Sequence, residues 1–264
     1  MHKLTRKVRF SINPFLPTDS SGFNTFSSKP AGEGLAVFFE LAVMLEGVVE
    51  EKTGFVVNVL DIDKQVREFV VPVFAGWIRR YFRQGRHAGF TEIAELLAES
   101  KEKLQGRFAN TKVGELALQL NPLRKVAIDC RRSNMIYFSE KFEFAATHKL
   151  WNDSLSEQEN FSVFGKCANP AGHGHNYIVE VTVKAKSGDL RIADFEKIVD
   201  EKLIRILDHK NLNVDVPHFS KVIPTVENLA VFAWDRLKGQ FDKAILHCVT
   251  IQETDRTSCT YYGE

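Results

Sequence analysis

The order of predicted strands and helices occurs twice along this 264-residue chain. Each half opens on a Phe-rich alternating strand, RKVRFSINPF in the first half and KFEFAATH in the second. A second strand, two segments of helical periodicity and two more strand-like runs follow in both halves. An internal repeat constrains the fold strongly, because both copies must adopt the same arrangement of elements. We therefore predict two domains of one α+β class, residues 1–140 and 141–264.

Four segments carry the helical signal: residues 59–74, 90–104, 190–207 and 224–237. In the second copy, apolar residues of 190–207 recur near the helical spacing, whereas 178–183 alternates as a strand does. No linker rich in Gly, Ser or Pro separates the copies, so the two domains are expected to be neighbours in space. The alternative is a chance similarity between two α+β patterns.

Charge and composition exclude several classes of protein. The formal net charge is +1, and a nucleic-acid-binding protein usually shows a basic stripe instead. The most apolar run, residues 35–45, spans 11 residues and contains Glu40, which is too short to cross a bilayer. No apolar signal core follows the basic start, and the four cysteines form no CxxC pair. We expect a cytoplasmic protein with reduced thiols that binds neither nucleic acid nor membrane.

A group of histidines in the second half has the spacing of metal ligands. His173 and His175 precede the alternating run YIVEVTV, and residues i and i+2 of a strand share one face. His148 ends another alternating run, and a neighbouring strand could bring it to the same place. Three neutral imidazoles with an open fourth position are typical of a catalytic zinc site. Cys167, six residues before His173, lies where a loop could hold a thiol over that position.

Residues 141–264 contain, in this order, the segments FEFAATHKL, FGKCANPAGHGHNY, LDHKNLNVDVP, PTVENLA, QETD and YYGE. On these segments, residues 141–264 resemble the 6-pyruvoyltetrahydropterin synthases, which have the tunnelling fold (T-fold). The resemblance implies that each half is a four-stranded antiparallel sheet with two helices on one face, closing into barrels by oligomerisation. The first half keeps this skeleton, including EKTGFVVNVLDIDK, but has no HGH, DH or ET motif. It resembles a degenerate T-fold domain without a metal site, beside a catalytic second domain.

The resemblance implies a carbon–oxygen lyase of tetrahydrobiopterin biosynthesis. The family reaction converts 7,8-dihydroneopterin triphosphate to 6-pyruvoyltetrahydropterin with loss of triphosphate. It is an internal redox reaction in which side-chain hydroxyls become carbonyls while the pterin ring is reduced. No nicotinamide is needed, and the sequence has no GxGxxG motif. The chemistry requires removal of protons from carbons that carry hydroxyls, and Zn²⁺ held by His148, His173 and His175 would make those protons more acidic.

The resemblance also implies the acid–base groups. Cys167 is the candidate base, and a thiol near zinc and other positive groups is expected to have a pKa below the free value of about 8.5. Asp208 and His209 form the second acid–base pair, which meets the Cys167 of a different subunit. Two structural alternatives stay open: Cys167 as a loop thiol without a role, and Asp208–His209 as a cap at the C-terminus of a helix.

Substrate binding is assigned in the same way. The resemblance places Glu253 where one carboxylate accepts the 2-amino group and the ring N–H of the pterin. Thr225 and Glu227, at the start of the predicted helix 224–237, are further candidates for lining the pocket. In the alternative reading, Glu253 only ends an edge strand with a charge.

Open sheet edges lead to a prediction about assembly. An isolated T-fold sheet has two open edges, and open edges invite pairing. Three two-domain chains would satisfy this need with one barrel of first copies stacked on one barrel of second copies. We therefore expect a homotrimer. In the alternative, the copies alternate around a single ring, and each catalytic domain has a degenerate neighbour.

Two other functions stay open. A 6-carboxytetrahydropterin synthase, of the deazapurine and queuosine pathway, takes the same substrate but releases acetaldehyde and triphosphate. Five residues separate Cys167 from His173, as in animal-type biopterin enzymes, whereas the carboxy enzymes usually have three. A non-catalytic pterin-binding barrel is the alternative from another class, because the first half has lost the motifs.

Overall fold

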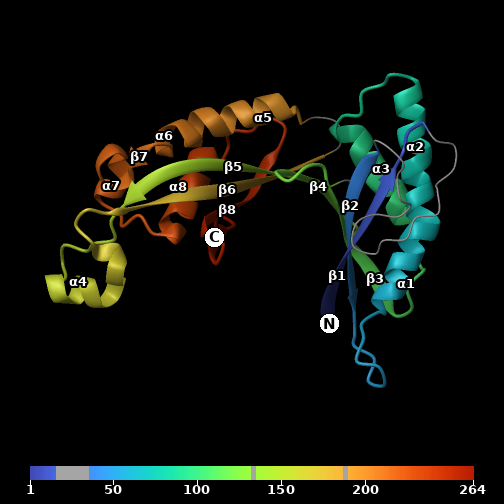
Figure 1. Ribbon diagram of the computed structural model, residues 1–264, viewed down its shortest axis with the longest axis horizontal. Coiled ribbons are helices and arrows are strands. Elements are labelled where there is room, and N and C mark those ends of the chain that lie inside the picture. The colour runs from blue at the N-terminus through green and yellow to red at the C-terminus, as the bar shows by residue number, and fades with distance from the viewer. Residues whose placement is uncertain (16–35, 132–134, 187–189) are drawn as a thin grey trace. The chain divides into compact units, whose positions relative to one another are not determined.

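The computed structural model describes residues 1–15, 36–131, 135–186 and 190–264. Met1–Phe138 form one compact unit, and Ser139–Lys184 with Leu190–Glu264 form another (Figure 1). Both units combine helices with antiparallel strand pairs, so the chain has the predicted α+β class. The border that we placed after residue 140 lies inside strand β5 (Ile136–His148), where no loop marks it.

The first unit contains four strands among its described residues: β1 (His2–Ile12), β2 (Val37–Gly47), β3 (Thr111–Gln119) and β4 (Arg124–Asp129). They lie in this order and pair antiparallel. Along β1, Val8, Phe10 and Ile12 alternate with more polar residues and are buried. This alternation places the core of the unit on one face of its sheet.

The helices of the first unit cover the sheet. The helical segment 59–83 consists of α1 (Val59–Gln65), a turn of π-helix (Val66–Val70) and α2 (Val71–Arg83). It runs beyond the predicted end at residue 74, because Trp77, Ile78 and Tyr81 continue the apolar helical spacing. The predicted helix 90–104 is confirmed as α3 (Phe90–Leu104). Helix α2 packs on β1, and α3 packs on β3 and β4.

The second unit has the strand order β5, β6 (His173–Ala185), β8 (Ile245–Thr254) and β9 (Thr257–Tyr261). Strand β8 pairs antiparallel with β6 and with β9. A two-residue strand, β7 (Lys210–Asn211), pairs in parallel with β5 at Ala146 and Thr147. This short pairing fixes the position of the LDHKNLN motif along β5.

Two of the second unit's helical segments agree with the predictions. The segment predicted at 190–207 comprises α5 (Ile192–Val199), a turn of π-helix (Asp200–Ile204) and α6 (Arg205–Leu207). Helix α8 (Val226–Leu237) matches the other prediction and packs on β8 and β9.

A sheet with two helices is nevertheless too simple a description of this unit. The sequence analysis missed α4 (Glu157–Phe164), two 3₁₀ turns (Gly165–Ala168 and Pro217–Ser220) and α7 (Leu212–Asp215). Helix α4 begins at a capping box, in which Ser156 and Glu159 bond each other's backbone N–H groups.

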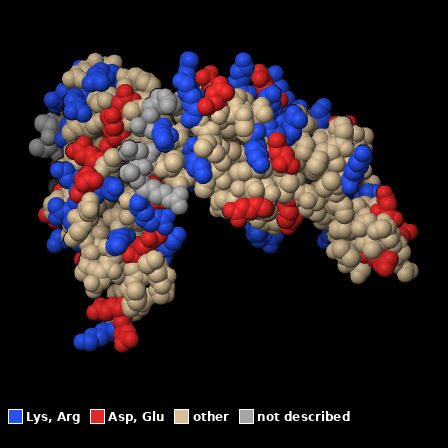
Figure 2. Space-filling model, turned by 180° about the vertical axis from the view of Figure 1, so that it is seen from behind, with Lys and Arg blue, Asp and Glu red and all other residues tan. Residues whose placement is uncertain are grey.

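The described strands do not close into a barrel, because their order ends at β1 on one side and β9 on the other. In Figure 2, Lys and Arg side chains are interspersed with Asp and Glu over the visible faces of both units. No helix in the described part of the chain combines the length and the apolar character needed to cross a membrane.

Candidate functional site

Three histidines meet where β5 ends and β6 begins. His148 is the last residue of β5, His173 is the first of β6, and His175 follows two residues later. Their candidate ligand atoms lie within 4.8 Å of one another, and no other group of this kind occurs among the described residues. His148 is 1% exposed and the other two are half-buried. The shared strand face predicted from the i and i+2 spacing therefore brings the imidazoles together.

The ring of His148 is oriented by the segment that leads into α8. Its Nδ1 lies 2.8 Å from the carbonyl oxygen of Pro224. A carbonyl only accepts hydrogen bonds, so Nδ1 carries the hydrogen and Nε2 keeps its lone pair. That Nε2 lies 3.0 Å from Nε2 of His173. A backbone carbonyl that fixes a histidine tautomer in this way is the usual outer contact of a metal ligand.

The chemistry of this cluster fits a divalent metal ion. Burial lowers the pKa of His148 and of His173, which favours the neutral imidazole that ligates metals. Nδ1 of His173 and Nε2 of His175 are buried and have no hydrogen-bond partner within the described ranges. A buried polar atom without a partner destabilises the fold. An ion with a preference for nitrogen ligands would satisfy such an atom.

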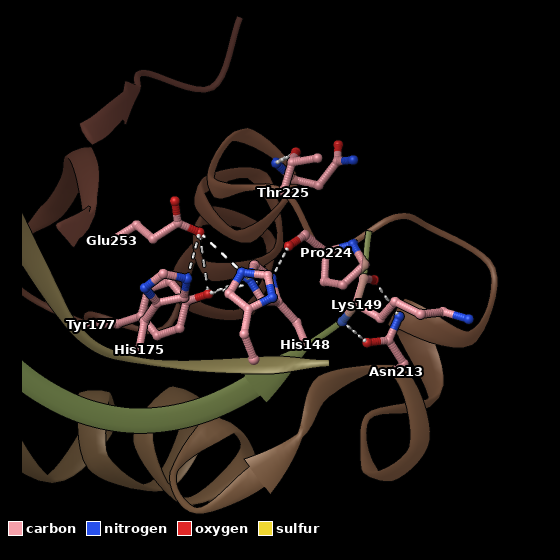
Figure 3. A network of polar contacts seen from close by, with 10 residues as sticks. His148, Lys149, His175, Tyr177, Asn213, Pro224, Thr225 and Glu253 are labelled. Carbon is pink, nitrogen blue, oxygen red and sulfur yellow. Dashed lines mark hydrogen bonds and ion pairs between the residues drawn. The ribbon is translucent and has the colours of Figure 1, made fainter. Parts of the chain in front are cut away.

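Glu253 stands beside the cluster (Figure 3). It lies on β8 where the register with β9 shifts between Gln252 and Thr254, as in a β-bulge. Its Oε1 lies 3.7 Å from Nε2 of His148 and 3.8 Å from Nε2 of His175. The carboxylate therefore points towards the histidines.

Tyr177 is a site residue that the sequence analysis did not identify. It follows His175 by two residues on the same face of β6 and is fully buried, with its ring stacked on Phe144 at 4.9 Å. Its hydroxyl lies 3.4 Å from Oε1 of Glu253 and 3.4 Å from Nδ1 of His148. Burial, followed by the charge of Glu253, raises the pKa of this phenol, which stays protonated. The i and i+2 spacing that identified the histidines would also have identified Tyr177.

Cys167 lies in the 3₁₀ turn Gly165–Ala168 that precedes β6. Its carbonyl accepts a hydrogen bond from the N–H of Leu150, which ties the turn to the residues after β5. Burial and the nearby charge of Glu253 raise the pKa of the thiol. The protein groups alone therefore act against the lowered pKa that we expected, because burial and the negative charge of Glu253 both disfavour the thiolate.

The side chains of Asp208 and His209 contact each other beside β5. Nδ1 of His209 lies 2.9 Å from Oδ2 of Asp208, and Oδ1 of Asp208 accepts from the N–H of Ala145 at 2.9 Å. Both contacts lower the pKa of Asp208, and the hydrogen bond from Ala145 has the larger effect. Asp208 also ends α6 as its C-cap, so the structural alternative and the acid–base role involve the same residue.

The pair stands apart from the histidine cluster of its own chain. The N–H of His209 donates to the carbonyl of Ala145 at 2.6 Å, and Ala145 precedes His148 by three strand residues. At a rise of about 3.3 Å per residue, this is about 10 Å along β5. The imidazole of His209 is 83% exposed.

Thr225 and Glu227 lie at the start of α8. The hydroxyl of Thr225 accepts from the N–H of Asn228 at 3.3 Å and caps the helix. Glu227 is in the first turn, and its charge contributes to raising the pKa of Cys259. In this segment the carbonyl of Pro224 contacts the cluster through His148, and sequence motifs cannot reveal a backbone contact of this kind.

A groove of about 450 Å³ lies between β5, β6 and β7. Among the residues that line it are Thr147, Gly174, His175, Asn176, His209 and Lys210. The side chains of Thr147 and Asn176 alternate along their strands with the three histidines and so point to the other face of the sheet. His175, a member of the cluster, lines the same groove as His209.

The family model described as 6-pyruvoyl tetrahydropterin synthase matches residues 137–264. A human protein named 6-pyruvoyl tetrahydrobiopterin synthase is 43% identical over 131 residues, which are 48% of this chain and 90% of the human one. The chain belongs to the 6-pyruvoyl tetrahydropterin synthase family. The resemblance inferred from the sequence motifs is confirmed.

Other members of the family match over a similar length. The Dictyostelium discoideum protein named 6-pyruvoyl tetrahydrobiopterin synthase is 37% identical over 137 residues, covering 50% of this chain and 99% of its own. The solved structure of the Caenorhabditis elegans 6-pyruvoyl tetrahydropterin synthase is 32% identical, with a TM-score of 0.47, and covers 49% of this chain and 96% of its own. Each of these matches involves about half of this chain.

Proposed function

We propose that this chain is a zinc-dependent 6-pyruvoyltetrahydropterin synthase. It would convert 7,8-dihydroneopterin triphosphate to 6-pyruvoyltetrahydropterin with elimination of triphosphate. The observation that carries the proposal is the cluster of three histidines in the half of the chain that matches the family. His148, His173 and His175 would hold the Zn²⁺ ion. When bound, zinc supplies a positive charge that makes the protons next to the substrate's side-chain oxygens more acidic.

Cys167 is the proposed base that takes a proton from a side-chain carbon of the substrate. The charge of Glu253 contributes to raising the pKa of its thiol, which supports a position close to the Glu253 carboxylate. Because burial and Glu253 raise the pKa of this thiol, the thiolate needs a positive neighbour. A divalent charge at the histidines would be that neighbour.

Asp208 and His209 are the proposed second acid–base pair. Oδ2 of Asp208 lies 2.9 Å from Nδ1 of His209 and orients the imidazole, which would exchange a proton with the substrate. The exposed ring of His209 and its separation from the cluster of its own chain support action on the site of a neighbouring copy. We propose a homotrimer for this reason. Light scattering should give the mass of three chains, and the mass of a dimer would contradict the trimer.

Glu253 is the proposed anchor for the pterin ring. A single carboxylate can accept the 2-amino group and the adjacent ring N–H at the same time. The carboxylate is half-buried, and burial strengthens a charged hydrogen bond of this kind. Thr225 and Glu227 remain candidates for the wall of the pocket, since both adjoin the segment that holds His148.

The first unit is proposed to be a degenerate copy without a metal site. Its β1 ends at Ile12, as β5 ends at His148, and its β2 begins at Val37, as β6 begins at His173. Ile12 and Phe39, the counterparts of His148 and His175, are apolar and buried. Phe39 stacks on Phe10 at 5.4 Å and fills the space with an aromatic ring.

A second feature supports the duplication. The first long helical segment of each unit, 59–83 and 192–207, contains one turn of π-helix. These turns are Val66–Val70 and Asp200–Ile204. Well under 1% of residues in globular proteins are in π-helices, so the recurrence of this turn at a similar place favours a common origin of the two copies.

A single assay tests the reaction. The zinc-loaded protein is incubated with 7,8-dihydroneopterin triphosphate and the products are identified. We expect triphosphate and 6-pyruvoyltetrahydropterin. Acetaldehyde would replace the proposal with a 6-carboxytetrahydropterin synthase, and pterin binding without turnover would favour the non-catalytic barrel. Purified protein that holds no zinc after reconstitution would contradict the metal site.

A further inference from the structure

Tyr177 has no part in the proposed acid–base steps, although it contacts the centre of the site. We propose that Tyr177 is a positioning residue, whose hydroxyl holds the carboxylate of Glu253 in the orientation that receives the pterin ring. The inference rests on the proposed function, because it assigns Glu253 to pterin binding. Figure 3 shows the phenol, the carboxylate and the ring of His148 meeting at one place.

The direction of the hydrogen bond follows from counting hydrogen atoms. The phenol has one hydrogen to donate, and it has three atoms within reach: Oε1 of Glu253 at 3.4 Å and the two ring nitrogens of His148 at 3.4 and 3.5 Å. Nδ1 of His148 already donates to Pro224 and cannot accept. Nε2 of the same ring carries the lone pair that is proposed to bind the metal. The carboxylate of Glu253 is therefore the acceptor.

The phenol is the rigid partner in this contact. Tyr177 lies on β6 between β5 and β8, is fully buried, and stacks on Phe144 with an interplanar angle of 11°. Its ring also lies edge-on to the ring of His175, with 5.5 Å between the ring centroids. Glu253 is half-buried and lies at a bulge next to the turn between β8 and β9. A fixed hydroxyl can thus hold a carboxylate that would otherwise be free to rotate.

The hydrogen bond from Tyr177 also affects whether the carboxylate of Glu253 binds the pterin or the metal ion. Oε1 of Glu253 lies within 3.8 Å of Nε2 of both His148 and His175, so the carboxylate is close to any ion that the histidines hold. Carboxylate oxygens are themselves zinc ligands. A hydrogen bond from Tyr177 would keep this oxygen turned to the phenol and leave the carboxylate available to the pterin. The separation of 3.4 Å is longer than the usual 2.7–2.8 Å, and we expect it to shorten when substrate binds.

The test is the Tyr177→Phe variant, which keeps the stacked ring and removes only the hydroxyl. We expect the KM for 7,8-dihydroneopterin triphosphate to rise about tenfold or more, as for loss of a hydrogen bond to a charged group, with kcat within about twofold. Zinc per chain should stay unchanged. In a Glu253→Gln background the same substitution should add little, because the charged acceptor is gone. Tyr81→Phe, which alters a buried tyrosine of the first unit, should match the wild type.

An unchanged KM in Tyr177→Phe, or an equal loss in the presence and absence of Glu253, would overturn the inference. A loss of zinc in Tyr177→Phe would also overturn it, because the phenol would then act through the metal. Calorimetric binding of neopterin to the zinc-loaded protein separates the two proposals, since it requires no turnover. If the wild type binds neopterin about tenfold more tightly than Tyr177→Phe but forms no product, only the proposed reaction fails. If the wild type does not bind neopterin, both fail.

Discussion

The protonation of individual imidazoles decides what the histidine cluster can do. His148 gives its one hydrogen to a backbone carbonyl, and burial lowers the pKa of both His148 and His173. A neutral ring is the form that binds a metal ion. The same property links stability to pH in the metal-free protein.

We predict that the metal-free protein loses stability as the pH falls below about 6.5, the pKa of an unperturbed histidine. Between that value and the lowered pKa values of the folded state, the unfolded chain binds more protons than the native one. Stability is therefore fully present above about pH 6.5 and decreases below it. Thermal unfolding from pH 7.5 to 5 measures the slope. It should become shallower in His148→Gln, and a slope of opposite sign would contradict the prediction.

Cys167→Ala tests the proposed base. Turnover should fall by at least about 100-fold, the lower range for general acid–base groups. Zinc content should not change, because the three histidines remain. Cys259→Ala, which removes another half-buried thiol of the second unit, is the matched control and should keep wild-type turnover. Unchanged turnover in Cys167→Ala would remove this residue from the mechanism.

At the scale of elements, the segment 208–213 is attached along the edge of β5. Asp208 bonds the backbone of Ala145, and β7 pairs with the next two residues of β5. At the far end, Asn213 accepts from the N–H of Lys149 at 2.7 Å and donates to its carbonyl at 3.0 Å. Lys149 follows His148 directly, so Asn213 holds the strand end that carries a proposed ligand.

We predict that Asn213→Ala destabilises the protein by about 1–3 kcal/mol, because two backbone groups of Lys149 lose their partner. Zinc affinity should fall by about tenfold or more, the usual effect of removing an outer contact of a metal site. Urea unfolding and competition with a chelator measure the two effects. Asn169→Ala removes an exposed side chain bonded to one amide and should change both quantities little. Wild-type zinc affinity in Asn213→Ala would refute the link to His148.

At the scale of the whole molecule, the histidine cluster belongs to one of two compact units. The second unit holds the three histidines, whereas in the first unit β1 ends at the buried, apolar Ile12. A ligand that binds only the native state stabilises the part of the protein that it contacts. Zinc is therefore expected to act on one unit.

We predict that removing zinc with a chelator weakens hydrogen-exchange protection within 139–184 and 190–264, while peptides from 1–15 and 36–131 keep theirs. Zinc at about 1,000 times its dissociation constant contributes about 4 kcal/mol to the stability of the unit that binds it. Exchange measured by mass spectrometry with and without zinc gives the comparison. An equal loss of protection in both units would contradict a metal site confined to the second.

Much of this organisation could be predicted from the sequence. The predicted helix 90–104 matches α3, and the segments 190–207 and 224–237 agree with the structure to within two residues at their ends. Apolar periodicity is local information, and it is strong in these segments. Helix α4 was missed because it is short and its buried side chain is a polar residue, Asn160, which gives no apolar signal.

For the site, the strand alternation put His173 and His175 on one face, because the side-chain period of a strand is contained in the sequence. That His148 joins them was expected from the alternating run it ends and from the family resemblance, and the structure brings the three rings together. The carbonyl of Pro224, the reach of the Glu253 carboxylate and the raised pKa of the Cys167 thiol became apparent only in the tertiary structure. These properties depend on burial and on distances between segments far apart in the chain, which no local pattern encodes.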